Sequence, residues 1–338
     1  MLHRKLPQMI VCLCLVLHSF LNGQPFTFEN IDEQDFDVPI EKPYDLVICA
    51  LFQNEELFMK EWIEYHKLLG VQHFYLYNNL STDHSLEILK PYIEAGEVDV
   101  FHWPIKTSNH SEMNALQIAT YMDALQIAKK TARWAAFIDI DEFLVPMKTN
   151  SLIRFLQDYE SYPGVIINWQ MYGTSGYDDI PNGKLLIETL LFKAQTNSVE
   201  HQYFKSIVQP AFVSHVTEPH SFHFFPGFFA VNPERTPHTA SGVGIHPSIC
   251  IDRIRINHYC LGTKNWFIFN KLPRREKWGM PKLTPIQLEN LFNQFNQVKD
   301  ESILRFVPAL RKKIFPFQTQ TVESFLENKM NEERIGAA

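Results

Sequence analysis

Three acidic side chains, Asp139, Asp141 and Glu142, close a buried apolar run near the middle of the chain. The surrounding stretch AAFIDIDEFLV (residues 135–145) is apolar on both sides of them, which is typical of a buried strand with carboxylates at its C-terminal end. Strand side chains alternate between faces, so Asp139 and Asp141 share a face unless the backbone turns between them. Two like charges so placed need a counter-charge, and a hard cation such as Mg²⁺ or Mn²⁺ is the expected one. The alternative is a solvated acidic turn.

The bulk composition is that of an ordinary globular protein. The chain has 338 residues, of which 45% are hydrophobic and 20% charged, enough for one large domain or two small ones. The formal net charge is −7, which argues against a nucleic-acid partner. A phosphorylated substrate would therefore need a metal or a few well-placed cations. Beyond the first 40 residues there are three cysteines, and this odd count favours free thiols, with a Cys250–Cys260 disulfide as the alternative.

The first 23 residues are expected to form a signal peptide or an uncleaved signal-anchor. Three basic-type residues, His3, Arg4 and Lys5, precede a short apolar run over residues 9–21. A charged start followed by a short apolar region is typical of a secretory signal, and the run is short for a spanning helix. We therefore expect a location in the secretory pathway or the cell envelope, with membrane association through this segment as a possibility.

From residue 44 onward, strand and helix patterns alternate. They predict strands over 45–52, 73–77, 98–103 and 134–140, separated by helices over 55–69, 85–95 and 111–130; a further strand is expected over 165–169 and a further helix over 286–305. This order predicts βαβ units and an α/β fold with a mostly parallel sheet in one large domain. That domain is expected to span residues 44–325, with a linker over 24–43 before it and a polar tail over 326–338 after it.

Ligands of such sheets bind where strands end at their carboxyl edge. Three polar segments fall there, over residues 53–55, 78–83 and 139–142. The sequence therefore predicts one polar site at that edge.

Six blocks in this order resemble glycosyltransferase family 92. They cover roughly residues 44–278 and are Gln53-Asn54-Glu55, Glu61-Trp62-Ile63-Glu64-Tyr65-His66, Tyr77 to Asp83, Trp134 to Phe143, Lys205-Ser206-Ile207-Val208 and Asn257-His258-Tyr259. The resemblance implies a nucleotide-sugar-binding fold of the GT-A type. It also implies that Asp139 and Asp141 bind Mn²⁺ or Mg²⁺ and, through it, the donor diphosphate, with His258 completing the metal shell. A hydrogen-bonded core histidine is the alternative for His258.

The resemblance places donor-binding residues at the first two strand ends. They are Asn54, Glu55, Asn78 and Asp83, whose amides and carboxylates suit a base or a ribose. Alternatively, Asn54 caps the following helix and the other loop forms Asx-turns. The chain departs from the family's pattern here, since Gln53 replaces a basic residue and Asn78 an aspartate.

Further contacts to the donor are expected from the later blocks. Glu142 would contact the sugar or support the metal ligands. Lys205 and the pair Arg274–Arg275 are candidate ligands of the diphosphate, since phosphate sites often need cations beyond the metal.

The general base that deprotonates the acceptor is expected among Asp178, Asp179 and Glu188, which follow the strand predicted over 165–169. Each can equally be a surface carboxylate.

The sequence thus favours a metal-dependent, inverting glycosyltransferase. It would move a hexose from a nucleotide donor, with UDP-galactose the first to test by resemblance, to a glycan hydroxyl. One alternative is a phosphohydrolase of the haloacid-dehalogenase type with Asp139 as nucleophile, and another is a non-catalytic glycan- or nucleotide-binding relative. Of two glycosylation sequons, at Asn79 and Asn109, the first is expected to stay unmodified because it lies in the proposed donor site.

Overall fold

The computed structural model describes residues 42–238 and 244–316 of the chain. The expected signal segment, most of the linker and the polar tail lie outside these described residues. In the described part, no helix is long and apolar enough to cross a membrane.

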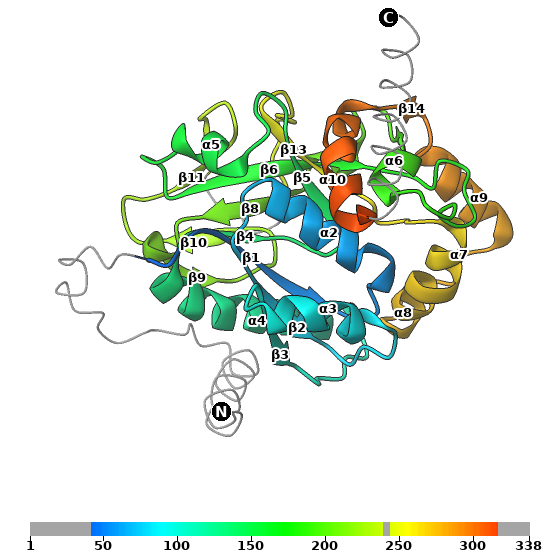
Figure 1. Ribbon diagram of the computed structural model, residues 1–338, viewed down its shortest axis with the longest axis horizontal. Helices are drawn as coiled ribbons and strands as arrows, with labels where there is room; N and C mark the ends of the chain where they lie inside the picture. Colours follow the sequence, from blue (N-terminus) through cyan, green and yellow to red (C-terminus); the bar gives the residue numbers. More distant parts are fainter. Residues whose placement is uncertain (1–41, 239–243, 317–338) are drawn as a thin grey trace, which may run out of the picture.

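The first half of the domain is built from alternating strands and helices (Figure 1). In order these are β1 (Tyr44–Phe52), α2 (Glu56–Leu68), β2 (His73–Asn78), α3 (Ser85–Glu94), β3 (Val98–His102), α4 (His110–Thr131) and β4 (Ala132–Phe137). The four strands lie in the order β4-β1-β2-β3, and every pair is parallel. The predicted βαβ units are therefore confirmed, and all four strands end at the same edge.

The second half extends the same sheet with strands of mixed direction. It contributes β5 (Glu142–Pro146), β6 (Gly164–Met171), β8 (Phe204–Val208), β11 (Ala230–Val231), β12 (Pro237–His238) and β13 (Ile254–His258). Strand β8 is antiparallel to both β4 and β6, and β13 lies between β5 and β6. The result is one ten-stranded sheet in an α/β domain, as predicted.

Two small sheets and several short helices complete the domain. The small sheets pair β9 (Val213–Val216) with β10 (Phe222–Phe224) and β7 (Phe192–Lys193) with β14 (Val298–Lys299). The remaining elements are α5 (Leu152–Gln157), α6 (Leu186–Thr189), η2 (Val199–Gln202), η3 (Pro210–Phe212), α7 (Lys264–Trp266), the π-helical turn η4 (Phe267–Lys271), α8 (Leu272–Lys277), α9 (Pro285–Gln294), η5 (Ser302–Phe306) and α10 (Val307–Ile314).

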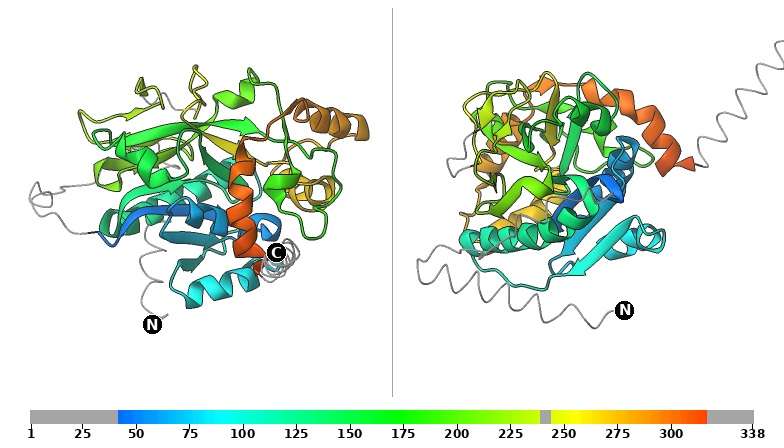
Figure 2. Two further views of the ribbon diagram at one scale, coloured as in Figure 1. Left: turned by 45° about the horizontal axis from the view of Figure 1, so that its top comes forward. Right: turned by 90° about the vertical axis from the view of Figure 1, so that its left-hand side faces the viewer.

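Two hydrophobic cores flank the sheet. Alternate residues of β1 enter them: Ile48 packs in the core that α2 covers, and its neighbour Cys49 packs in the core that α4 covers. The two helices therefore cover opposite faces of the sheet (Figures 1 and 2). Cys49, Cys250 and Cys260 are all free thiols, as the odd count predicted.

The prediction of a single helix over residues 286–305 is wrong. Helix α9 begins as expected, with Thr284 as a cap whose hydroxyl accepts a hydrogen bond from Gln287 N (3.3 Å), and with Pro285 in its first turn. It ends at Gln294, and strand β14 and the 3-10 helix η5 follow. The break has a tertiary cause, since Lys299 of β14 pairs with Phe192 of β7.

Candidate functional site

Asp139 and Asp141 lie in a tight turn between β4 and β5, and not on a strand as predicted, while Glu142 is the first residue of β5. Strand β4 ends at Phe137, where the prediction extended it to Ile140. Glu142 closes the turn, since its N–H donates to Asp139 O (3.1 Å) and its Oε2 accepts from Asp139 N (3.0 Å). Ile140 is buried and anchors the turn in the core. The alternation of side chains along a strand therefore does not determine which way Asp139 and Asp141 point. We call residues 139–142 the carboxylate turn.

Asp139 is paired with a buried lysine. Lys205 of β8 is only 1% exposed, and its Nζ lies 2.9 Å from Asp139 Oδ2. Burial opposes the charge on Lys205, but the nearby carboxylates of Asp139 and Glu142 outweigh it and raise the pKa of Lys205. Gln117 of α4 donates a second bond to Asp139 (2.9 Å). The buried cation thus comes from β8, which only the fold places beside β4.

Asp141 is buried between a histidine and a second lysine. His258 Nε2 lies 3.4 Å from Asp141 Oδ1, and Lys271 Nζ lies 2.5 Å from Asp141 Oδ2. Burial disfavours the Asp141 carboxylate, but Lys271 and His258 more than offset this and hold its pKa well below the usual range. Neighbouring Glu142 is fully buried, which raises its pKa well above the ordinary value although Lys205 opposes the shift. Of the two neighbouring acids, Asp141 therefore holds its negative charge more strongly than Glu142 does.

Strand pairing brings His258 to the carboxylate turn. Strand β13 is antiparallel to β5, with His258 opposite Glu142, and Tyr259 N donates to Asp141 O (2.8 Å). Trp169 of β6 packs against His258, with ring centroids 4.5 Å apart. Two sequence blocks that are more than 100 residues apart thus form one site.

The candidate ligands of a divalent cation are the side chains around the carboxylate turn. His258 Nδ1 and Glu142 Oε1 are buried 3.9 Å apart, and neither has a hydrogen-bond partner in the described part of the chain. Within residues 42–238 and 244–316, no group of three or more His, Cys, Asp or Glu side chains is arranged to hold an ion by itself. Mg²⁺-type ions are usually held by one or two carboxylates plus substrate phosphates, and the Asp141 carboxylate matches such a partial shell.

Helix α2 fixes the strand that follows the carboxylate turn. Trp62 Nε1 donates to Glu142 O (2.7 Å), and Tyr65 Oη donates to Leu144 O (2.9 Å). His66 also binds this strand, since its Nε2 accepts a hydrogen bond from Leu144 N (3.2 Å). Burial lowers the pKa of His66 to about 3, so this imidazole is a neutral acceptor. The sequence analysis singled out the block at residues 61–66, but it did not predict that this block contacts β5.

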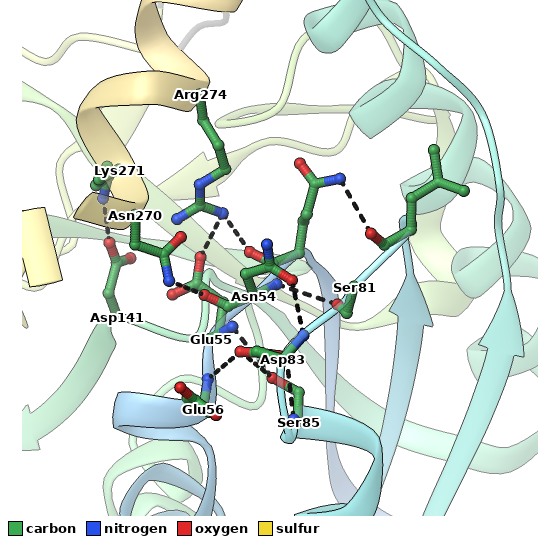
Figure 3. A network of polar contacts seen from close by, with 12 residues as sticks. Asn54, Glu55, Glu56, Ser81, Asp83, Ser85, Asp141, Asn270, Lys271 and Arg274 are labelled. Atoms are coloured by element: carbon green, nitrogen blue, oxygen red, sulfur yellow. Dashed lines mark hydrogen bonds and ion pairs between the residues drawn. The ribbon is translucent and has the colours of Figure 1, made fainter.

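Two of the expected donor residues, Asn54 and Asp83, hold together the loops that follow β1 and β2 (Figure 3). Asn54 has a positive φ of 55°, and its Oδ1 accepts from Thr82 N (2.7 Å) and Asp83 N (3.3 Å). Asn54 is therefore not the helix cap, a position that Glu55 takes.

Asn78 and Asp83 make the local bonds of the Asx-turn alternative. Asn78 Oδ1 accepts from Ser81 N (3.1 Å), and Asp83 Oδ1 accepts from Ser85 N (3.0 Å). Asp83 also accepts from Glu56 N (2.9 Å), which ties α2 to this loop. Both side chains lie at the predicted edge and carry its loop structure, while a direct role in binding a nucleotide stays a prediction.

Glu55 is buried beside an arginine from the C-terminal part of the domain. Arg274 Nη1 lies 2.9 Å from Glu55 Oε1 and also donates to Gln53 O. Burial raises the pKa of Glu55 to about 7, although Arg274 opposes the shift.

The three candidate bases lie in the segment before β7, each with its own partner. Asp178 is exposed and pairs with Lys264 (3.3 Å), and Asp179 accepts from Asn265 Nδ2 (2.7 Å). Glu188 of α6 pairs with Arg311 of α10 (2.6 Å). The general-base role of each stays a prediction.

Other residues of the site were missed from the sequence. They are Gln117 and Tyr121, which contact Asp139, and Lys271, which contacts Asp141. Gln117 and Tyr121 lie four residues apart on α4, so helical spacing alone gave a weak signal. Lys271 begins a basic stretch, KLPRREK, and no local pattern indicates its partner.

Fold and site together define an α/β protein with buried acidic side chains and their basic partners at the carboxyl ends of parallel strands. The family model described as Glycosyltransferase family 92 matches residues 44–298, which is more than half of the chain. The chain therefore belongs to glycosyltransferase family 92.

Several curated plant proteins are similar to this chain. A glycosyltransferase family 92 protein of Ricinus communis is 27% identical over 202 residues, covering 58% of this chain and 34% of that protein. Galactan beta-1,4-galactosyltransferase GALS2 of Arabidopsis thaliana is 32% identical over 128 residues, covering 35% of this chain and 24% of that protein. The matches thus span about a third or less of the relatives' length. Among solved structures, Staphylococcus aureus TarS has a TM-score of 0.33 at 12% identity, covering 50% of this chain and 48% of that one.

Proposed function

We propose that this protein is a metal-dependent, inverting glycosyltransferase that moves a hexose from a nucleotide-sugar donor to a hydroxyl group of a glycan. The observation that carries the proposal is the buried Asp141, which His258 and Lys271 contact at the carboxyl end of β4. Membership of family 92 supports the reaction class. A cation and a diphosphate together match the charges of such a site better than either alone.

Each chemical role falls to a different part of the site. Asp139, Asp141 and His258 are the residues that would hold Mn²⁺ or Mg²⁺, which supplies Lewis-acid stabilisation of the departing nucleoside diphosphate. Lys205 pairs with Asp139 and holds its side chain in place, and Glu142 closes the turn through its backbone and one carboxylate oxygen.

Displacement with inversion requires a base on the face opposite the leaving group. Asp178, Asp179 and Glu188 remain the candidates for this role.

UDP-galactose is the donor that we propose to test first. Support comes from the similarity to three galactan beta-1,4-galactosyltransferases of Arabidopsis thaliana. The acceptor would then be a glycan or glycoconjugate, and the enzyme would act in the secretory pathway or the cell envelope.

The test is a panel of nucleotide sugars, each assayed for hydrolysis and for transfer with and without Mn²⁺. We expect one UDP-hexose to be consumed in the presence of Mn²⁺, with loss of consumption in Asp141→Asn. Binding of UDP and Mn²⁺ with no turnover on any donor would instead indicate a non-catalytic relative. A phosphate trapped covalently on Asp139 would indicate a phosphohydrolase.

A further inference from the structure

A helical segment from the C-terminal part of the domain reaches into the site. It runs from α7 through the π-helical turn η4 into α8, and we call residues 264–277 the basic segment. Single π-helical turns are rare and frequently occur at functional sites. Here the turn contains Lys271, and Arg274 follows three residues later, so both side chains can point to one side of the segment.

Three side chains of the basic segment contact the strand-end loops (Figure 3). Lys271 binds the Asp141 carboxylate, and Arg274 binds the Glu55 carboxylate. Asn270 Nδ2 donates to the backbone oxygen of Asn54 (3.1 Å). One element therefore joins the end of β1 to the carboxylate turn after β4, where a donor nucleotide and its diphosphate would lie in the proposed function.

The bonds of this network leave hydrogen-bonding capacity unused. Arg274 Nε and Glu55 Oε2 are buried and have no hydrogen-bond partner in the described ranges 42–238 and 244–316. Buried polar groups are normally paired, so this unpaired donor and this unpaired acceptor are available to a bound water or a polar ligand.

The position of Lys271 creates a competition. Its ammonium lies on Asp141 Oδ2, so a cation that binds Asp141 through this oxygen must displace it. The displaced ammonium then needs another anion, because an unpaired charge in a mostly buried place is costly. A complex of a divalent cation with a diphosphate supplies both the replacement cation for Asp141 and the new anion for Lys271.

We propose that Lys271 is a ligand of the donor diphosphate that exchanges partners: it pairs with Asp141 in the donor-free protein and with the diphosphate in the bound protein. The inference rests on the proposed function and adds a residue and a binding order to it. A divalent cation alone binds weakly because it competes with Lys271. The cation and the diphosphate bind strongly together.

Lys205, the other lysine of the site, is not suited to this exchange. Its side chain is 1% exposed on a central strand, whereas the Lys271 side chain is 23% exposed on a short helical segment. Lys271 can therefore swing to a new partner without disrupting the sheet.

The experiment compares wild type with Lys271→Met in two binding titrations. The first measures Mn²⁺ binding to the donor-free protein by electron paramagnetic resonance of the unbound ion. The second measures binding of UDP at saturating Mn²⁺ by calorimetry. We expect Lys271→Met to bind Mn²⁺ about tenfold more tightly and UDP about tenfold more weakly, a tenfold change being about 1.4 kcal/mol. Inorganic pyrophosphate replaces UDP in a parallel titration, which makes the result independent of the base.

Two further variants control the comparison. Lys277→Met removes an exposed lysine of the same segment and should change neither affinity. Lys271→Arg keeps the positive charge and should retain most of the affinity for UDP.

Opposite changes in the two affinities support the exchange. Parallel losses would reduce Lys271 to a structural residue, and unchanged affinities would overturn the inference while leaving the proposed function intact. If wild type binds neither UDP nor pyrophosphate with Mn²⁺, both the inference and the proposed function fail.

Discussion

The buried pair of Lys205 and Asp139 offers a sharp test of the site's electrostatics. We expect Lys205→Met to lower the free energy of unfolding by about 3 kcal/mol. Removing one partner of a buried ion pair costs about 3–5 kcal/mol, because the remaining charge stays buried without compensation. The lower end applies because the Asp139 side chain is 33% exposed and water can solvate part of its charge. For the 270 described residues, an unfolding entropy of about 2.1 cal/mol/K per residue makes the midpoint of thermal unfolding fall by roughly 5 °C.

The chain contains a matched control for this measurement. Arg133 and Glu160 form an ion pair of nearly the same length, 2.8 Å against 2.9 Å, but their side chains are 49% and 47% exposed. Exposed pairs contribute about 0–1 kcal/mol, so Arg133→Met should change the stability by less than about 1 kcal/mol. The difference between the two variants measures burial, since charge and distance are matched.

A double-mutant cycle completes the test. Asp139→Asn combined with Lys205→Met removes both charges, so the double variant should be more stable than the sum of the single effects predicts, by about 1–3 kcal/mol. Urea unfolding monitored by tryptophan fluorescence supplies all the values. A loss below about 1 kcal/mol in Lys205→Met, or purely additive effects, would refute the reasoning.

Three further predictions address other parts of the domain. Asp141→Asn should lower glycosyl transfer by about a hundredfold or more while the far-ultraviolet circular dichroism spectrum stays unchanged, and near-normal turnover would contradict its assignment. Burial raises the pKa of Glu61 to about 7, although two backbone N–H groups oppose the shift. The stability that its bound proton contributes is therefore complete below pH 4.5 and lost as the pH rises through about 7. The free energy of unfolding, measured from pH 4.5 to 8, should decline less steeply in Glu61→Gln than in wild type, and an unchanged slope would argue against the raised pKa. Asn79 should carry no glycan, because its amide is buried and donates to Trp103 O and Ile105 O, whereas Asn109 is exposed. Peptide mapping of protein from a eukaryotic secretory host tests this prediction, and a glycan on Asn79 would refute it.

Local sequence patterns predicted the first half of the fold closely. The boundaries of β1, α2 and β2 agree with prediction to within one residue. Apolar periodicity, Gly70 after α2 and the polar loops between elements carry this information within windows of about 15 residues. Prediction failed where the partner is distant, as at residues 286–305, since β14 exists only because it pairs with β7.

The site divides in the same way. Asp139, Asp141 and His258 were predicted to be metal ligands, and that role stays a prediction; the structure places His258 beside Asp141. The sequence did not predict that Lys205 and Lys271 would each pair with one of these two aspartates. Lys205 was expected at a diphosphate, and it lies on Asp139; Lys271 was not singled out at all.

The sequence by itself determined the alternation of strands and helices, the edge at which polar loops gather and the presence of an acidic pair beside it. Hydrophobic period and turn residues act over a few neighbours, so these features need no knowledge of the fold. Tertiary structure alone decided that a turn ends β4 before Asp139, that β13 delivers His258, and that a π-helical turn brings Lys271 to Asp141. Each of these depends on strand register or helix docking between distant segments, and the energy of such contacts is not encoded in any local window.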